Sequence, residues 1–125
     1  MLGVDAVEIE RIKKLIDSDA GEKFLQKAFT AGEMDYCTHK GKYKYDSLAA
    51  RFAVKEAVGK ALGVGVLTEI DLMDIEVAND VKGKPEVILQ GRALALAKEK
   101  KIAGFEISLT HTTEMAIAVT LAVKE

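Results

Sequence analysis

ARFAVKEAVGKALG, residues 50–63, is the most informative stretch of the chain, because it predicts a long helix at the centre of the molecule. Its apolar residues recur every three or four positions, as on the core-facing side of a helix (Phe52, Ala53, Ala57, Val58, Ala61 and Leu62). Arg51 and Lys55 share one side of this helix, and Glu56 projects about 100° further round. One interpretation makes Glu56 and Lys60 an ordinary surface pair, with Arg51 and Lys55 solvated. The other interpretation is that these charges are directed at a ligand.

The N-terminal stretch LGVDAVEIERI, residues 2–12, places an acid inside an apolar run. It predicts a strand at 1–5 and a helix from about 6 to 17. A carboxylate buried in such a strand must be hydrogen-bonded, paired or bound to a metal, because desolvating it alone costs several kcal/mol. Asp5 is therefore either the N-cap of the helix, a common role for aspartate, or a ligand. The local sequence favours neither.

The C-terminal stretch FEISLTHTTEMAIAVTLAV, residues 105–123, predicts a hairpin over 104–123 that closes the fold. His111 lies at or near its turn, so its imidazole is expected at a rim. There it could exchange protons or, when charged, contact a phosphate. The second strand is apolar at consecutive positions, which predicts that both of its faces are covered. One cover could be a neighbouring subunit, so the sequence predicts self-association.

Local signals mark the ends of several helices. Thr30 and Glu33 form a T-x-x-E capping box, which predicts a break at Thr30 in the helical region 21–40. Glu33 could therefore have a purely structural role, as part of this capping box. Asp46 is the expected N-cap of the long helix, and Gly63 is placed to end it.

The remaining elements are expected, in chain order, as the long helix at 47–62, strands at 71–79 and 85–90, and a helix at 91–101. Strands pair mainly with their neighbours through hairpins. The predicted fold class is therefore α+β, a small single domain with a largely antiparallel sheet, a long central helix and further helices packed on it.

Composition sets wider bounds. A chain of 125 residues, 49% of them hydrophobic, suits one soluble domain over 1–125 that buries about two-thirds of its unfolded-chain surface. The single cysteine, Cys37, excludes an intrachain disulfide, and we do not expect it to be catalytic. No signal peptide or apolar run of about 20 residues is present, so no membrane association and a cytoplasmic location are expected. A net charge of −2 gives no general attraction to nucleic acid.

Four segments, taken together, resemble the holo-acyl-carrier-protein synthases, the small type of 4'-phosphopantetheinyl transferase. They are GVDAVEIERI at 3–12, FTAGE at 29–33, RFAVKEAVGKALG at 51–63 and SLTHT at 108–112. Their order and spacing agree with that family across nearly the whole chain. One departure is Gly59, where members of the family commonly have a small polar residue, often serine.

The resemblance implies an activity and a fold. The activity is the transfer of the 4'-phosphopantetheine arm of coenzyme A, the co-substrate, to a serine hydroxyl of apo acyl carrier protein for fatty acid synthesis, with release of adenosine 3',5'-bisphosphate. The implied fold is 4'-phosphopantetheinyl transferase-like. The attacking hydroxyl belongs to the carrier protein, so no nucleophile of this chain is required. Its proton could pass to a metal-bound water, Glu56 or His111.

The resemblance also implies roles for particular residues. Asp5 and Glu56 would hold one Mg²⁺, which prefers oxygen ligands and typically bridges carboxylates and substrate phosphates. Lys60 would face the diphosphate and stabilise the charge that develops there. The other expected contacts to coenzyme A come from Arg51, Lys55, His111, Thr112, Lys42 and Lys44 at phosphates and from Gly83, Lys84 and Pro85 at the adenine, although these last three also read as a plain turn.

Two partners are implied besides coenzyme A. The acidic carrier protein would dock on the first helix through Arg11, Lys13 and Lys14, with encounter steered by charge, although these residues could also form a solvated helix face. Further copies of the chain would form a homotrimer with active sites between subunits.

Two other classes of function fit the same residues. A magnesium-dependent hydrolase of nucleotide diphosphates would use the same carboxylates and lysines. A non-enzymatic module that binds coenzyme A or a nucleotide would keep the cations without the metal.

Overall fold

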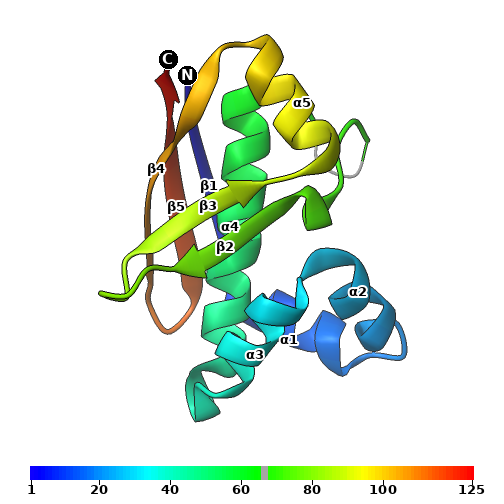
Figure 1. The fold of residues 1–125 in the computed structure, drawn as a ribbon. Helices are drawn as coiled ribbons and strands as arrows, with labels where there is room; N and C mark the ends of the chain where they lie inside the picture. The colour runs from blue at the N-terminus through cyan, green and yellow to red at the C-terminus, as the bar shows by residue number, and fades with distance from the viewer. Residues whose placement is uncertain (66–67) are drawn as a thin grey trace.

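The computed structural model describes residues 1–65 and 68–125, and Figure 1 shows the arrangement of the elements. The helices are α1 (Ile9–Asp17), α2 (Gly21–Ala28), α3 (Ala31–Thr38), α4 (Lys44–Leu62) and α5 (Gly91–Glu99), with 3₁₀ turns at Gly41–Tyr43 and Leu72–Asp74. The strands are β1 (Leu2–Glu8), β2 (Ile75–Asn79), β3 (Pro85–Leu89), β4 (Ile102–His111) and β5 (Met115–Lys124). The predicted α+β class with antiparallel sheets is confirmed.

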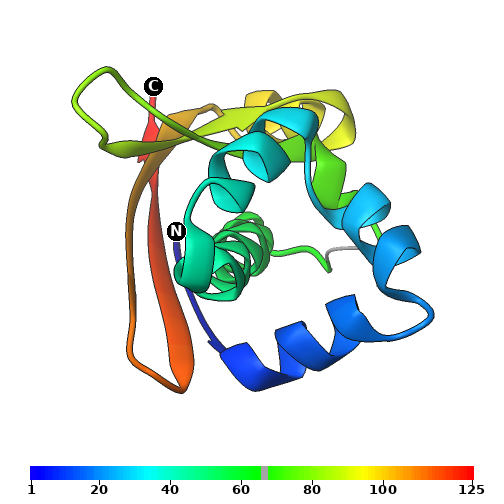
Figure 2. The same ribbon diagram turned by 90° about the horizontal axis from the view of Figure 1, so that it is seen from below.

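Helix α4 runs through the centre of the molecule (Figure 1). Seen along its axis in Figure 2, a sheet lies on one side, and the β2–β3 hairpin and α1 lie on two further, opposite sides. The sheet lies very close to the backbone of α4: a Cβ on Gly3 would be only 1.9 Å from the carbonyl oxygen of Ala57. The Thr120 hydroxyl donates to that same oxygen at 3.1 Å. Glycine at position 3 therefore allows β1 to rest on the helix backbone.

The sheet has the strand order β1-β5-β4, with both pairings antiparallel. Asp5 on β1 pairs in register with Ala118 of β5, and His111 on β4 pairs with Ala116. Strands β1 and β4 thus form opposite edges of this sheet. Residues at the two edges are separated by the full width of β5.

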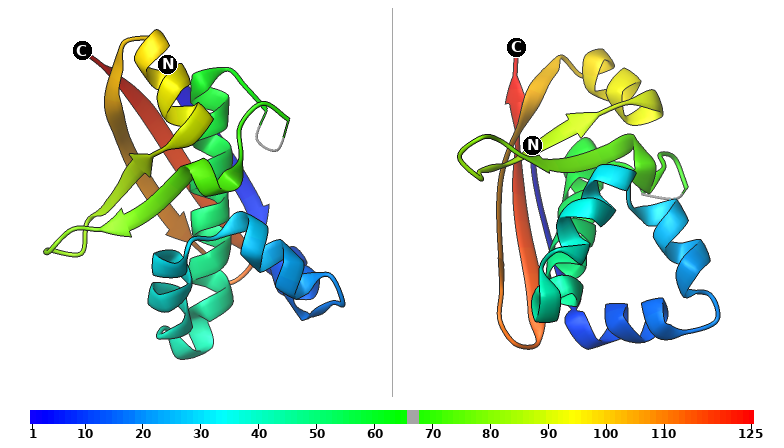
Figure 3. Two further views of the ribbon diagram at one scale, coloured as in Figure 1. Left: turned by 45° about the vertical axis from the view of Figure 1, so that its right-hand side comes forward. Right: turned by 60° about the horizontal axis from the view of Figure 1, so that its bottom comes forward.

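Strands β2 and β3 form an antiparallel hairpin that crosses in front of α4 and projects beyond β4 (Figure 3). Its turn contains Gly83, which has a φ of 84°, a conformation that glycine adopts without strain. The turn is closed by Asp80, which accepts the backbone N–H groups of Lys82 and Lys84 at 2.8 and 2.9 Å. The hairpin therefore extends as an ordered arm.

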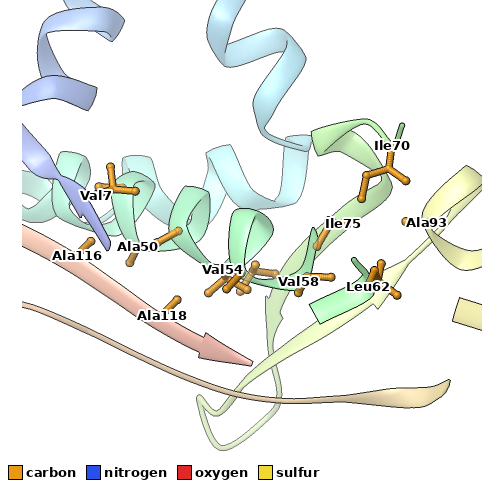
Figure 4. Packing of buried hydrophobic residues seen from close by; sticks show 14 of the residues in the cluster. Val7, Ala50, Val54, Val58, Leu62, Ile70, Ile75, Ala93, Ala116 and Ala118 are labelled. Atoms are coloured by element: carbon orange, nitrogen blue, oxygen red, sulfur yellow. The ribbon is translucent and has the colours of Figure 1, made fainter. Parts of the chain in front are cut away.

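The apolar core follows α4 along its length (Figure 4). Small alanines of β5 face the helix, while bulkier residues fill the space toward β2 and α5. The labelled members of this cluster are Val7, Ala50, Val54, Val58, Leu62, Ile70, Ile75, Ala93, Ala116 and Ala118. In the residues that the structure describes, no helix is long and apolar enough to cross a membrane.

Strand β5 alternates between a covered and an open face. Ala116, Ala118, Thr120 and Ala122 are buried against the interior. The opposite face of the sheet is apolar yet 38–56% exposed at Val4, Ile117, Val119, Leu121 and Val123. Helix α4 thus supplies one of the two covers that the sequence predicts, and in the single chain the other face of the sheet is open.

A buried ion pair ties α4 to the elements on its other side. The Lys55 ammonium, fully buried, donates to Glu33 at 2.7 Å and to the backbone carbonyls of Ala28 and Leu72 at 2.6 and 3.1 Å. The second oxygen of Glu33 accepts the Val77 N–H at 2.8 Å. Burial lowers the pKa of Lys55, and the Glu33 carboxylate opposes that shift. The pair thus links α4 to α3, to β2, to the end of α2 and to the 3₁₀ turn Leu72–Asp74.

Several sequence predictions about boundaries are confirmed. The helical region breaks at Thr30 with the expected reciprocal capping box to Glu33, and Gly63 ends α4 in the left-handed conformation at a φ of 76°. The C-terminal hairpin is also present as predicted.

Other boundaries were wrong. Strand β1 continues to Glu8 and α1 starts at Ile9, so Asp5 lies within a strand and is not an N-cap. Helix α4 starts at Lys44 because the preceding 3₁₀ turn leads directly into it, which places Asp46 in its first turn and not at its cap. The predicted strand at 71–79 begins only at Ile75, after the 3₁₀ turn.

We predict that Lys55→Met lowers the free energy of unfolding by about 3–5 kcal/mol, because it leaves the Glu33 carboxylate buried without its cation. Urea unfolding followed by circular dichroism measures this change. The double variant Glu33→Gln with Lys55→Met should recover part of the loss, since neither charge remains.

Lys82→Met, at the exposed tip of the β2–β3 turn, is the control and should change stability by less than about 0.5 kcal/mol. If Lys55→Met were no more costly than this control, the structural role of the ion pair would be refuted.

Candidate active site

Two acids and a lysine meet where β1 lies against α4. Lys60 donates from its ammonium to the Asp5 carboxylate and to the Val4 carbonyl, both at 3.0 Å. Burial raises the pKa of Glu56, the nearby Asp5 carboxylate raises it further, and the Lys60 ammonium opposes both effects. The side chain of Lys60 remains 56% exposed, so its ammonium is accessible from solvent. The structure therefore brings Asp5, Glu56 and Lys60 together at one edge of the sheet.

These two carboxylates suit a cation that takes few ligands from the protein. Asp5 disfavours the charged form of Glu56, and a cation between like charges would relieve that cost. Among the described residues, no group of three or more His, Cys, Asp or Glu side chains is arranged to hold a metal ion. Mg²⁺ commonly binds through one or two carboxylates, with substrate phosphates and water as its other ligands. The donor set at Asp5 and Glu56 fits this pattern.

A separate cavity of about 390 Å³ lies between α3, α4, β4 and the β2–β3 hairpin. Arg51 forms part of its wall and is only 4% exposed. Its guanidinium lies over the ring of Tyr36 at 4.2 Å and donates to Ser47 at 3.2 Å and to Asn79 at 2.7 Å. Within the described parts of the chain, Arg51 pairs with no carboxylate, and its Nε has no hydrogen-bond partner. A buried cation without a counter-charge favours an anionic ligand.

The hairpin forms one rim of this cavity, and a chain of hydrogen bonds couples it to Arg51. Asn79 accepts from Arg51 through its oxygen and donates through its nitrogen to the Gly83 carbonyl at 2.9 Å. Gly83 and Pro85 line the cavity. Lys84 does not, because its ammonium lies 3.8 Å from Glu106 on β4.

Other cationic and aromatic side chains surround the opening. Lys40 and His111 line the cavity, and Lys40 lies over the Tyr36 ring at 4.5 Å. A hydrogen bond from Lys40 lowers the pKa of Tyr36 against the effect of burial. Lys42 lies over the ring of Tyr43, which is itself part of the wall. The walls thus combine positive charge with flat apolar surfaces.

The carboxylate pair and the cavity lie on different sides of α4. Glu56 and Arg51 are five residues apart, which turns their side chains about 140° from each other. Asp5 is at the β1 edge of the sheet, whereas His111 is at the β4 edge. Helix α4 therefore separates the two sites within one chain.

The structure does not place every expected residue at a site. Lys55 is buried in its ion pair with Glu33, so the expected phosphate contact from Lys55 is not met. The alternative that Arg51 and Lys55 are solvated is also wrong, because α3 and β2 cover this side of the helix.

Six further expected residues lie outside the cavity wall. Lys42 is exposed beside the cavity-lining Tyr43, whereas Lys44 is half-buried and lies over the ring of Tyr45, which does not line the cavity. Thr112 shapes the β4–β5 turn, where its hydroxyl accepts the N–H groups of Glu114 and Met115. Arg11, Lys13 and Lys14 are exposed on α1, which continues directly from β1.

Sequence reasoning missed several residues of the cavity. Ser47 lies four residues before Arg51 and therefore shares its side of the helix, a spacing that could have revealed it. Tyr36 and Asn79 reach Arg51 from α3 and β2, and no local pattern signals those contacts.

The chain is similar to a known protein family over most of its length. The model of the 4'-phosphopantetheinyl transferase superfamily matches residues 1–120. The holo-[acyl-carrier-protein] synthase of Ruminiclostridium cellulolyticum is 42% identical over 118 residues, covering 94% of this chain and 87% of its own length. That of Treponema denticola is 45% identical over 120 residues, covering 96% of this chain and 94% of its own length.

Solved structures of holo-[acyl-carrier-protein] synthases are also similar to this chain. Helicobacter pylori holo-[acyl-carrier-protein] synthase, in complex with coenzyme A, superposes with a TM-score of 0.84 at 32% identity, over 98% of this chain and 99% of that one. The Neisseria meningitidis enzyme gives a TM-score of 0.85 at 31% identity, over 98% and 97%. This chain therefore belongs to the 4'-phosphopantetheinyl transferase superfamily and, within it, to the holo-[acyl-carrier-protein] synthases.

Proposed function

We propose that this protein transfers the 4'-phosphopantetheine arm of coenzyme A to a serine hydroxyl of apo acyl carrier protein and releases adenosine 3',5'-bisphosphate. One observation carries the proposal in a chain of this family. Buried Arg51, which pairs with no carboxylate among residues 1–65 and 68–125, lines one site, and the carboxylates Asp5 and Glu56 form another. The protein therefore offers separate places for an anionic nucleotide and for a cation.

The residues divide the work as follows. Asp5 and Glu56 would hold Mg²⁺ at the diphosphate. The bound ion would polarise the attacked phosphorus and neutralise charge on the leaving group. Lys60, held by Asp5 and the Val4 carbonyl, presents an accessible ammonium that stabilises the negative charge developing as the diphosphate bond breaks. Arg51 and His111 bind the phosphates of the nucleotide end, and Gly83 and Pro85 border the place of its base.

The active site is composed from two copies of the chain. One coenzyme A molecule must reach both the cavity and the carboxylate pair, which α4 separates within a chain. The exposed apolar face of the β1-β5-β4 sheet offers a surface for the association. Each copy would use one surface for its own carboxylates and a different one for its cavity, which makes the interface heterologous and favours a closed ring. A homotrimer is the ring that the family resemblance implies.

Carrier protein would dock next to the carboxylate pair. Helix α1 follows β1 without a linker and exposes Arg11, Lys13 and Lys14 close in sequence to Asp5. These cations would steer an acidic carrier protein toward the site, with a rate that falls as salt rises. We also infer that residues 1–125 act as one transferase domain for fatty acid synthesis in the cytoplasm.

Mass spectrometry of the carrier protein tests the function directly. Incubation with coenzyme A, Mg²⁺ and apo carrier protein should add the mass of one phosphopantetheine arm. Glu56→Gln should lower the rate by at least about 100-fold, because one metal ligand and its charge are lost, while Glu22→Gln on the exposed face of α2 leaves it unchanged.

The same incubation separates the alternatives. Release of adenosine 3',5'-bisphosphate without labelled carrier would support a hydrolase, and binding of coenzyme A with neither product would support a binding module. Full transfer by Glu56→Gln would refute the assignment of the metal ligand.

We predict that Mg²⁺ binds more weakly as the pH falls, and that this loss begins at a higher pH than the pKa of about 4.3 of a free glutamate would give. Burial and Asp5 raise the pKa of Glu56, so a proton competes with the cation over a higher pH range than for a free glutamate. The measurement is the Mg²⁺ concentration that gives half-maximal transfer at each pH. A half-saturating concentration that rises only in the pH range of a free glutamate would contradict the shift.

Mixed oligomers test the shared active site. Glu56→Gln and Arg51→Gln should each be inactive alone, yet their co-assembled mixture should recover about one quarter of wild-type activity, the chance that a normal Glu56 meets a normal Arg51 at one interface. Native mass spectrometry verifies that mixed oligomers form. Mixed oligomers with no activity would show that both residues must come from the same copy.

A further inference from the structure

Both histidines of this chain lie beside an aspartate, but only one pair borders the cavity. The Nδ1 of His111 is 3.3 Å from the Asp46 carboxylate, and the two side chains are 39% and 20% exposed. The Nδ1 of His39 is 3.8 Å from Asp35, and those side chains are 77% and 81% exposed. The first pair is thus shorter, better shielded and part of a binding site.

The fold holds the His111 ring in place. His111 is the last residue of β4, and Asp46 lies in the first turn of α4, where the helix dipole favours a negative charge. Tyr43, just before α4, places its ring 6.3 Å from the imidazole, centroid to centroid. The ring is therefore contacted by two residues from the same end of α4.

This placement gives the two ring nitrogens different tasks. A carboxylate only accepts hydrogen bonds, so Asp46 favours the form of His111 that carries a proton on Nδ1. Nε2 lies on the other side of the ring and has no hydrogen-bond partner among the residues that the structure describes. It is the nitrogen left for a ligand in the cavity that Arg51 lines.

We propose that Asp46 is a positioning residue for nucleotide binding, which holds Nδ1 of His111 so that Nε2–H of the protonated ring donates to a phosphate oxygen beside Arg51. This inference rests on the proposed function. The proposal assigns His111 to substrate binding, because its imidazole lines the same cavity as Arg51 and Lys40. It also gives Asp46 a role in place of the helix cap that the sequence suggested.

Calorimetry with adenosine 3',5'-bisphosphate tests the proposal without relying on turnover. Asp46→Asn should bind this ligand about tenfold more weakly, because the charged group that orients His111 is lost. The KM for coenzyme A should rise by a similar factor, with kcat changed by less than about twofold. Asp35→Asn removes the same charge from the other histidine pair and should leave both constants unchanged.

Two further measurements make the test specific. ¹⁵N NMR of the wild-type protein should show the neutral His111 ring protonated at Nδ1, and Asp46→Asn should lose this preference. Adding Asp46→Asn to His111→Gln should weaken binding no further, because Asp46 acts through His111.

Unchanged affinity in Asp46→Asn, or a fall in kcat without a change in KM, would overturn the proposal, and the second result would make His111 a proton acceptor. Absence of transfer by the wild-type protein would instead refute the proposed function, while the calorimetry and NMR would still report on the Asp46–His111 pair.

Discussion

The buried ion pair between Lys55 and Glu33 holds together the elements that surround α4. It lies at the meeting point of α4 with α3, β2, the last residue of α2 and the 3₁₀ turn before β2. A lysine ammonium in the interior must satisfy its hydrogen bonds there, and the available acceptors fix where these elements lie. Because these elements cover α4 at Lys55, that part of the helix is closed to ligands, and the sites lie elsewhere along it.

Helix α4 can then serve two sites because its period turns neighbouring charges in different directions. Glu56 and Lys60 are four residues apart and meet Asp5 at the β1 edge. Arg51 shares a side with Lys55 but lies one turn nearer the N-terminus, where the hairpin and Tyr36 enclose a cavity. The spacing of charges along one helix therefore determines which edge of the molecule meets the cation and which meets the nucleotide.

The sequence predicted the family, the α+β class and the main elements, because those depend on motifs and local periodicity. It also singled out Asp5, Glu56 and Lys60, which the structure brings to one edge of the sheet. The predicted phosphate contact of Lys55 was wrong, because the partner of this lysine, Glu33, lies on another element and no local pattern signals their contact. The capping box seemed to account fully for Glu33, yet its carboxylate also binds Lys55 and Val77. Asp46 met a local rule for helix caps, although its contact with His111 depends on how β4 packs against α4.

The charges of the two sites are unfavourable for the free protein and favourable for its ligands. Arg51 is buried without an anion among the described residues, and Asp5 disfavours the charged form of Glu56. A fold selected for stability alone would pair or remove these groups. Phosphates would neutralise Arg51, and a divalent cation would offset the repulsion between the acids. The excess charge on α4 is thus best explained by ligands that arrive together, as the coenzyme A and Mg²⁺ of the proposed reaction would.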